Sequence, residues 1–262
     1  MNQKLKVKKF QESLLNSWPA KHYYFLNGWI LRFTDGVTSR ANSVLPINYT
    51  GSSKTCEKDI GIVEKAYKTF NLPSIFMMHD FYEPAELDDI LKARGYIQYG
   101  PTTNVMSIPI EEMVFKSINK KISYNLYNER VSQFSEFHGK FSKRSIENQK
   151  VLEAIASKIK IPQKIFILAK YQGNAVGALM SVIDALGHLS LTGLLVNPEF
   201  RRERIATSMI YKLIEDWAKI KGAKIVWLSV ESDNNAAINL YNKLGLNKIF
   251  SYYYLIKNLS EL

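Results

Sequence analysis

The sequence has a single cysteine, Cys56, among its 262 residues. One cysteine cannot form a disulfide within the chain, and this composition is typical of the reducing cytoplasm, where we expect the protein to act. No histidine stands near Cys56 in the sequence. We therefore expect a small inert residue there and not a catalytic thiol.

Long apolar runs and metal-ligand spacings are also missing from the sequence. No apolar run reaches the ~18 residues that a membrane-spanning helix needs, so we expect no membrane segment. The N-terminal stretch "MNQKLKVKKF" carries lysines but no apolar core after them, which argues against a secretory signal. The four histidines stand far apart without ligand spacing, and we expect no metal.

The composition that remains is that of an ordinary globular protein. Apolar residues make up 46% and charged residues 23% of the chain. The formal net charge is +11, which raises the possibility of nucleic-acid binding. Lysine is spread along the whole chain without a long basic run, so we interpret the charge as mostly solvated surface.

Hydrophobic periodicity and turn residues predict a mixed α/β chain. A connection rich in lysine and asparagine, at 110–122, is the best candidate for a domain boundary, so we predict domains at 1–112 and 113–262. The predicted helices cover 10–26, 56–72, a segment from Pro84 to Gly95, 130–138, 145–159, a segment from Ile205, and 234–245; the predicted strands cover two runs in 28–47 joined at Asp35-Gly36, then 74–80, 104–110, 122–128, three in 164–196, 224–230 and 247–257.

The two halves end alike. The stretch "LDDILKARGYIQYGPTTNVMSI" of the first half resembles "AINLYNKLGLNKIFSYYYLI" of the second, since each runs from a helix through a glycine into a strand. This weak repeat predicts that one fold occurs twice in the chain.

One stretch of the second half suggests an anion site. The apolar strand 188–196 ends before Asn197-Pro198, and an amphipathic helix begins at Ile205. The first turn of a helix has unpaired N–H groups and a partial positive charge. Three arginines, Arg201, Arg202 and Arg204, stand at or just before that turn. The stretch is therefore either an anion site or a solvated basic loop.

The second half has three features in a fixed order: "GLLVNPEFRRERIATSMI", the strand "IVWLSV", and "NNAAINLYNKLGL". With these features it resembles the GNAT superfamily of acyl-CoA-dependent N-acetyltransferases, and the resemblance covers about 122–258. It implies a tandem GNAT-like α+β fold with a central, mostly antiparallel sheet flanked by helices. The first half looks like the additional N-terminal domain of two-domain GNAT proteins. Because it lacks the arginine-bearing loop, we assign it no cofactor; it either shapes the acceptor pocket or is a packing partner only.

The resemblance also implies a set of site residues for acetyl-CoA. The loop N–H groups would receive the pyrophosphate, the end of the preceding strand would bulge and pair with the pantetheine arm, and Asn234 would be a second contact. Arg204 stands where the family usually has glycine, and a side chain costs little there only if the backbone is helical. The implied cofactor-binding residues are Leu194, Leu195, Val196, Arg201, Arg202, Glu203, Arg204, Ile205, Ala206, Thr207 and Asn234.

Tyr241 is the implied catalytic residue, as the acid that meets the leaving thiolate. A tyrosine (pKa ~10) is a weaker acid than a simple thiol (~8.5), so complete proton transfer is uphill by about 2 kcal/mol. The tyrosine would then act mainly by hydrogen bonding; the other interpretation is a tyrosine that fills the core. The general base is left open, and its two candidates are Glu231 and a water chain. The other interpretation of Glu231 is a surface glutamate.

Function is therefore predicted as acetyl transfer from acetyl-CoA to a primary amine. The acceptor stays open among small amines, peptide N-termini, lysine and antibiotics. A catalytically silent protein that binds acyl-CoA is the alternative that Arg204 keeps open, and a nucleic-acid-binding protein is the alternative that rests only on net charge.

Overall fold

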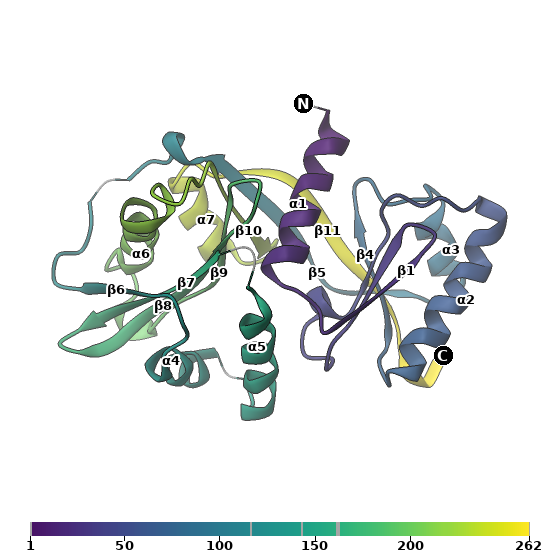
Figure 1. The fold of residues 1–262 in the computed structure, drawn as a ribbon, viewed down its shortest axis with the longest axis horizontal. Helices are drawn as coiled ribbons and strands as arrows, with labels where there is room; N and C mark the ends of the chain where they lie inside the picture. Colours follow the sequence, from purple (N-terminus) through teal and green to yellow (C-terminus); the bar gives the residue numbers. More distant parts are fainter. Residues whose placement is uncertain (1, 116, 143, 161–162, 262) are drawn as a thin grey trace. The chain divides into compact units, whose positions relative to one another are not determined.

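The computed structural model describes residues 2–115, 117–142, 144–160 and 163–261. The chain forms two compact units that are discontinuous in sequence (Figure 1). The first unit comprises Met1–Val105, Glu231–Asp233 and Ile249–Leu262, and the second comprises Met106–Val230 and Asn234–Lys248. The sequence prediction instead placed one boundary between residues 112 and 113. In the structure the segment after residue 105 belongs to the second unit, and the C-terminal strand belongs mostly to the first.

The first unit consists of an N-terminal helix, a mostly antiparallel sheet and two further helices. Its strands are ordered β1-β2-β3-β4-β11, and the only parallel neighbours among these are β3 and β4 in the described residues. Its elements are α1 (Gln3–Ser17), β1 (His22–Leu26), β2 (Trp29–Phe33), η1 (Ser39–Ala41), β3 (Val44–Leu45), α2 (Ser53–Thr69), β4 (Ser74–His79), α3 (Leu87–Ala93), β5 (Ile97–Pro109, entering the second unit) and, after β11, η5 (Leu259–Glu261).

The predicted helix 10–26 is wrong in its second part. Helix α1 ends at Ser17, because Pro19 lacks the N–H that a continuing helix needs. Residues 22–26 are the strand β1, which forms a hairpin with β2 through Asn27 and Gly28. Both turn residues have positive φ, 46° and 90°, as a type I′ turn requires. The predicted junction at Asp35-Gly36 is likewise replaced by a longer connection that contains η1.

The stretch "GWILRFTDGVTSRANSV", residues 28–44, is held together by contacts within the first unit. Trp29, Leu31 and Phe33 alternate into its core. Between them, Arg32 is fully buried and donates from Nε to the Ser43 carbonyl at 2.8 Å. Burial lowers the pKa of Arg32. These contacts give the stretch a structural role in the first unit.

The second unit follows the predicted order of elements from residue 122 onward. Its strands are ordered β10-β9-β8-β7-β6, with β9 and β10 parallel and the other neighbouring pairs antiparallel. Its elements are η2 (Ile110–Glu112), β6 (Ser123–Tyr127), α4 (Ser132–Ser142), α5 (Ile146–Lys158), β7 (Gln163–Tyr171), β8 (Asn174–Ile183), β9 (His188–Val196), η3 (Pro198–Phe200), α6 (Ile205–Leu213) continued by a π-helical turn η4 (Ile214–Ala218), β10 (Ile225–Glu231), α7 (Asn235–Lys243) and β11 (Asn247–Lys257, which continues into the first unit).

Helices cover both faces of the second unit's sheet. In Figure 1, α4 and α6 lie on opposite sides of the strands β7–β9. Phe134 of α4 meets Phe166 of β7 edge-on, with ring centroids 5.0 Å apart. On the other face, a Cβ atom on Gly177 of β8 would lie 3.1 Å from Cγ2 of Ile205, so α6 approaches the sheet closely at this glycine.

The same arrangement of strands occurs in both units. In the first, β2 and β3 are antiparallel, β3 and β4 are parallel, and α2 connects β3 with β4. In the second, β8 and β9 are antiparallel, β9 and β10 are parallel, and α6 connects β9 with β10. None of the helices in the described ranges is both long and apolar enough to cross a membrane.

Candidate functional site

The predicted strand, loop and helix of 188–217 are present in the second unit. Strand β9 ends at Val196, and Asn197 caps the short turn η3 by accepting from Glu199 N–H. Helix α6 begins at Ile205. The four residues before it, 201–204, are all exposed. The first N–H groups of α6 have no acceptor within the helix, so they face the same solvent-accessible loop.

Two arginines of this loop have left-handed backbones. The φ angles are 65° at Arg202 and 58° at Arg204. The backbone of Arg204 is left-handed and not right-handed helical, whereas the helix that begins at Ile205 is right-handed. A left-handed residue beside right-handed ones turns successive N–H groups toward one side, which is the geometry of an anion-binding concavity. A side chain costs more free energy in the left-handed region, which glycine adopts without strain.

A segment of the 110–122 connection is bonded to this loop. Nη1 of Arg204 donates to Oγ of Ser117. Nδ2 of Asn119 donates to the Glu203 carbonyl at 2.9 Å, and N–H of Asn119 donates to Oγ of Ser208 at 3.0 Å. The connection is thus an ordered support for the loop at these residues. The sequence analysis missed this role, because neither residue stands near the loop in sequence.

Strand β9 bulges just before the loop. The pairing with β8 shifts from Ala178↔Leu195 to Met180↔Thr192, which leaves Gly193 and Leu194 opposite one residue of β8. Gly193 has a φ of 63°, in the region that favours glycine. On the other side of β9, the pairing with β10 ends at Trp227↔Ser190. Between 191 and 196, β9 therefore has a backbone edge that β10 does not pair in the described residues.

Asn234 and Tyr241 lie on the last helix of the second unit. Asn234 is the N-cap of α7, and its side-chain oxygen accepts from Ala237 N–H at 3.2 Å. Its side-chain amide is therefore left as a donor at an exposed helix start. Tyr241, two turns further on, has 8% of its surface exposed and belongs to the core of the unit, against which Leu194 and Val196 also pack.

Burial changes the acidity of Tyr241. Desolvation raises the pKa of its hydroxyl to about 12. Relative to a simple thiol, full proton transfer from this tyrosine is then uphill by about 5 kcal/mol. A thiolate can still receive a hydrogen bond from the neutral hydroxyl. The environment therefore favours hydrogen-bond donation over acid catalysis in the strict sense.

The other two titratable residues singled out in the sequence are Glu231 and Cys56. Glu231 ends β10, is exposed, and falls in the part of the chain that completes the first unit. Cys56 is buried on α2, and desolvation raises its pKa to about 11, as suits an inert thiol. Within the described residues, no group of three histidine, cysteine or acidic side chains is placed to hold a metal ion.

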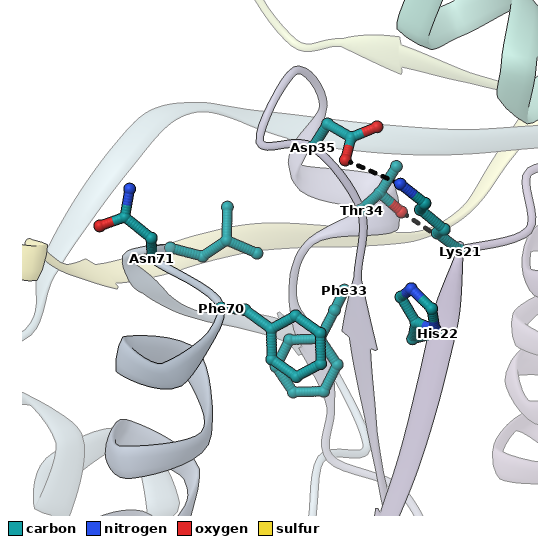
Figure 2. A pocket seen from close by; sticks show the side chains of 8 residues that line it. Lys21, His22, Phe33, Thr34, Asp35, Phe70 and Asn71 are labelled. Carbon is teal, nitrogen blue, oxygen red and sulfur yellow. Dashed lines mark hydrogen bonds and ion pairs between the residues drawn. The ribbon is translucent and has the colours of Figure 1, made fainter.

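A cavity of about 300 Å³ lies within the first unit (Figure 2). Its polar groups already pair with one another: Lys21 Nζ lies 3.4 Å from the Asp35 carboxylate, and Lys21 N–H donates to Thr34 Oγ1 at 3.1 Å. We assign no ligand to it. The cavity is lined by Lys21, His22, Phe33, Thr34, Asp35, Phe70, Asn71 and Leu72.

Comparison with known proteins gives the geometry of the second unit its context. The model of the acetyltransferase (GNAT) family matches residues 124–246. The chain is 30% identical over 254 residues to an uncharacterized N-acetyltransferase, YobR, of Bacillus subtilis (strain 168), covering 96% of this chain and 98% of that protein. It is 33% identical over 77 residues to the [ribosomal protein bS18]-alanine N-acetyltransferase of Escherichia coli (strain K12), covering 29% and 51%.

Solved structures agree on the fold. A GCN5-related N-acetyltransferase from Kribbella flavida aligns with a TM-score of 0.69 at 10% identity, covering 97% of this chain and 95% of that one. A tandem GNAT protein from the clavulanic acid biosynthesis pathway aligns with a TM-score of 0.61 at 10% identity, covering 77% and 69%. The strand order, the loop before α6 and a relative that matches almost end to end lead to the same conclusion: the chain belongs to the GNAT family of acetyltransferases.

Proposed function

We propose that the protein transfers an acetyl group from acetyl-CoA to a primary amine by direct attack in a ternary complex. The observation that carries the proposal is the loop 201–204, which presents three exposed arginines and two left-handed residues at the N-terminus of α6. A pyrophosphate needs a concave set of N–H donors and positive charge. The three arginines supply the charge, and the left-handed residues before the helix N-terminus support a concave set of donors. Membership of the GNAT family supports acyl transfer as the reaction class.

The fit of acetyl-CoA extends beyond the loop. Backbone groups of Arg201–Thr207 would bind the pyrophosphate, and Leu194–Val196 would pair with the amide groups of the pantetheine arm along the edge that β10 leaves unpaired. The amide of Asn234 would donate at the start of α7. When bound, acetyl-CoA supplies the activated thioester carbonyl, and the protein holds the thioester and the amine in position.

The proposed reaction needs no covalent enzyme intermediate. The amine nitrogen forms a bond to the carbonyl carbon, the carbon–sulfur bond breaks, and the amine proton passes to a base that we leave unassigned. Holding both reactants in line supplies much of the acceleration. A backbone N–H at the β9 bulge would stabilise the oxyanion, and the Tyr241 hydroxyl would donate a hydrogen bond to the leaving sulfur.

We expect acetyl-CoA to bind at the loop with an affinity in the micromolar range. Replacing Arg201 or Arg202 by alanine should weaken binding about 3- to 10-fold each, because each change removes a charged donor near the phosphates. Isothermal titration calorimetry at modest salt measures both effects.

Lys221→Ala is the matched control for these variants. It removes one exposed positive charge from the same unit, beyond the opposite end of the α6–η4 helix, and should leave affinity unchanged. Equal losses in all three variants would mean that overall charge and not the loop attracts the ligand. An absence of heat and of any thermal shift with excess acetyl-CoA would refute the proposal.

The left-handed Arg204 favours one alternative, a protein that binds acyl-CoA without turning it over. We expect Arg204→Gly to relieve backbone strain and raise the free energy of unfolding by about 0.5–1 kcal/mol, net of the lost contact with Ser117. Because the side chain is directed to Ser117, acetyl-CoA affinity should stay within about 3-fold, since the backbone makes the proposed contacts. Urea unfolding and calorimetry test the two parts. A gain in affinity above about 10-fold would mean that Arg204 obstructs acetyl-CoA binding, whereas unchanged affinity without CoA release for any amine would favour the silent protein.

The acceptor is proposed only as a class. Two relatives carry names that specify protein substrates, the ribosomal-protein alanine acetyltransferase and an N-terminal acetyltransferase B subunit of Arabidopsis thaliana. Peptide N-termini therefore belong in the first acceptor screen, beside small amines, lysine peptides and aminoglycosides. Release of free CoA thiol is the readout, and acetyl-CoA alone is the blank.

A further inference from the structure

The β9 bulge is contacted by one side chain that no sequence motif singled out. Nε2 of His138, on α4, lies 3.0 Å from the carbonyl oxygen of Gly193. Gly193 is the bulged residue itself, immediately before Leu194–Val196. Both residues belong to the second unit, so the contact is internal to it.

Packing fixes the His138 ring in place. Its imidazole stacks on Phe134, with centroids 4.8 Å apart and planes at 27°, and Phe134 in turn packs on Phe166 of β7. Phe134 and His138 are four residues apart on α4, so they share one face of the helix. On the opposite side of the contact, a Cβ on Gly193 would lie 3.2 Å from Cε1 of His138. Any side chain at 193 would therefore push the ring and the bulge apart.

The chemistry of the contact determines the tautomer. A carbonyl oxygen only accepts, so Nε2 must carry the hydrogen and donate it. Desolvation, together with the nearby positive charges of Arg130 and Arg144, lowers the pKa of His138 to about 4, although the bond to Gly193 opposes the shift. The ring is thus neutral near pH 7, with hydrogen on Nε2 and a lone pair on Nδ1.

We propose that His138 is a positioning residue that holds the β9 bulge in the shape that receives the thioester. The inference rests on the proposed acetyl transfer and specifies which side chain supports its oxyanion and pantetheine contacts. Without the imidazole donor, the Gly193 peptide loses its partner and can rotate about its φ and ψ angles. The N–H groups that follow it would then lose their alignment, and a misplacement of about 1 Å at a reacting centre costs up to ~100-fold in rate.

Two variants separate hydrogen bonding from packing. His138→Phe keeps an aromatic ring on Phe134 and removes the donor. His138→Gln places an amide nitrogen at about the position of Nε2 and keeps the donor. We expect His138→Phe to lower kcat ~10- to 100-fold with the KM for acetyl-CoA within about 3-fold, and His138→Gln to recover most of the lost rate. Thermal midpoints of the two variants should be alike.

The same proposal has a readout that needs no acceptor. Nitrogen-15 spectra of the four histidines between pH 6 and 8 should include a neutral ring protonated at Nε2 whose signals disappear in His138→Phe. His79, whose Nδ1 accepts from Phe81 N–H, should give a second such ring that persists in the variant. Titration of the wild type with acetyl-CoA should shift the amide signals of both 193–196 and 201–207. In His138→Phe the shifts at 201–207 should persist and those at 193–196 should change.

These experiments distinguish the positioning role of His138 from the proposed acetyl transfer on which it rests. A wild type that shows the tautomer and both sets of shifts, yet releases no CoA with any amine, would refute acetyl transfer and leave His138 as the support of the bulge. A wild type that transfers acetyl groups while His138→Phe does so at the same rate would overturn the inference alone. Equal loss in the Phe and Gln variants, or an imidazole protonated at Nδ1, would overturn it as well.

Discussion

Replacing Tyr241 by phenylalanine is expected to lower turnover by ~10- to 1,000-fold while acetyl-CoA affinity changes little. The substitution keeps the ring in the core of the second unit and removes only the hydroxyl. A hydrogen bond to the leaving sulfur strengthens as the carbon–sulfur bond breaks, so its loss affects the transition state more than the bound ground state. The range is the usual span for a lost acid or oxyanion donor.

The raised pKa of Tyr241 sharpens this expectation. Because burial puts the pKa at about 12, the hydroxyl stays protonated across the whole neutral range. The turnover of the wild type should therefore show no basic limb that disappears in Tyr241→Phe. A limb near pH 9 that vanished with the hydroxyl would mean that the tyrosine titrates in the complex as a true acid.

Tyr252→Phe is a matched control for the hydroxyl deletion. Tyr252 is also buried, on β11, but belongs to the first unit. It should alter stability at most and leave kcat unchanged. Full activity in Tyr241→Phe, once an acceptor is identified, would return Tyr241 to a packing role and leave positioning as the catalytic strategy.

The elements of the second unit were predictable because their signals are local. Helix α5 was predicted from residue 145, and it begins at Ile146, where the Ser145 side chain caps it by accepting from Asn148 N–H. Helix α7 was predicted to end at residue 245, and it ends at Lys243, shortly before Gly245, whose positive φ closes the helix. Caps and turns act within a few residues, so a sequence window contains their cause.

What the sequence did not predict depends on partners far along the chain. Residues 22–26 are a strand because β2 pairs with them, although their own pattern does not exclude a helix. The C-terminal strand completes the first unit by pairing Tyr252–Lys257 with β4, a contact across more than half the chain. No local pattern specifies such an exchange, so a single boundary near residue 112 was the natural prediction.

The candidate site also combines features that have a local sequence signal with features that depend on distant residues. Sequence motifs identified the loop arginines and helix α7, because the residue types and their spacing both occur within one short stretch of the chain. The left-handed backbone at Arg202 and Arg204 has no comparable sequence signal, and the contacts of this loop with Ser117 and Asn119 reach more than 80 positions along the chain. The bond from His138 to Gly193 joins residues 55 positions apart. A lone histidine on a helix has no sequence signal for such a role.

Gly28→Ala is expected to be among the most destabilising single substitutions in the chain. Gly28 has a φ of 90°, and a Cβ there would lie 1.8 Å from the backbone oxygen of Asn48 and 2.6 Å from its carbonyl carbon. These are main-chain atoms, so no flexible side chain can move aside. Left-handed strain costs about 1 kcal/mol and forced backbone displacement about 1–3 kcal/mol more.

Gly95→Ala is the control that separates the two costs of the Gly28 variant. Gly95 has nearly the same φ, 88°, but an added Cβ would meet no atom within 4 Å. It should therefore lose only about 1 kcal/mol, whereas Gly28→Ala should lose about 2–4 kcal/mol, a large part of an ordinary domain's stability. Urea unfolding followed by tryptophan fluorescence detects the first unit through Trp29, which lies in its core, stacked on Tyr49 at 4.8 Å, and the second unit through Trp217 and Trp227. Equal shifts of the two midpoints would show that the β1–β2 hairpin yields to the added methyl group, and that the close packing of Asn27-Gly28 against Asn48 does not restrain the fold.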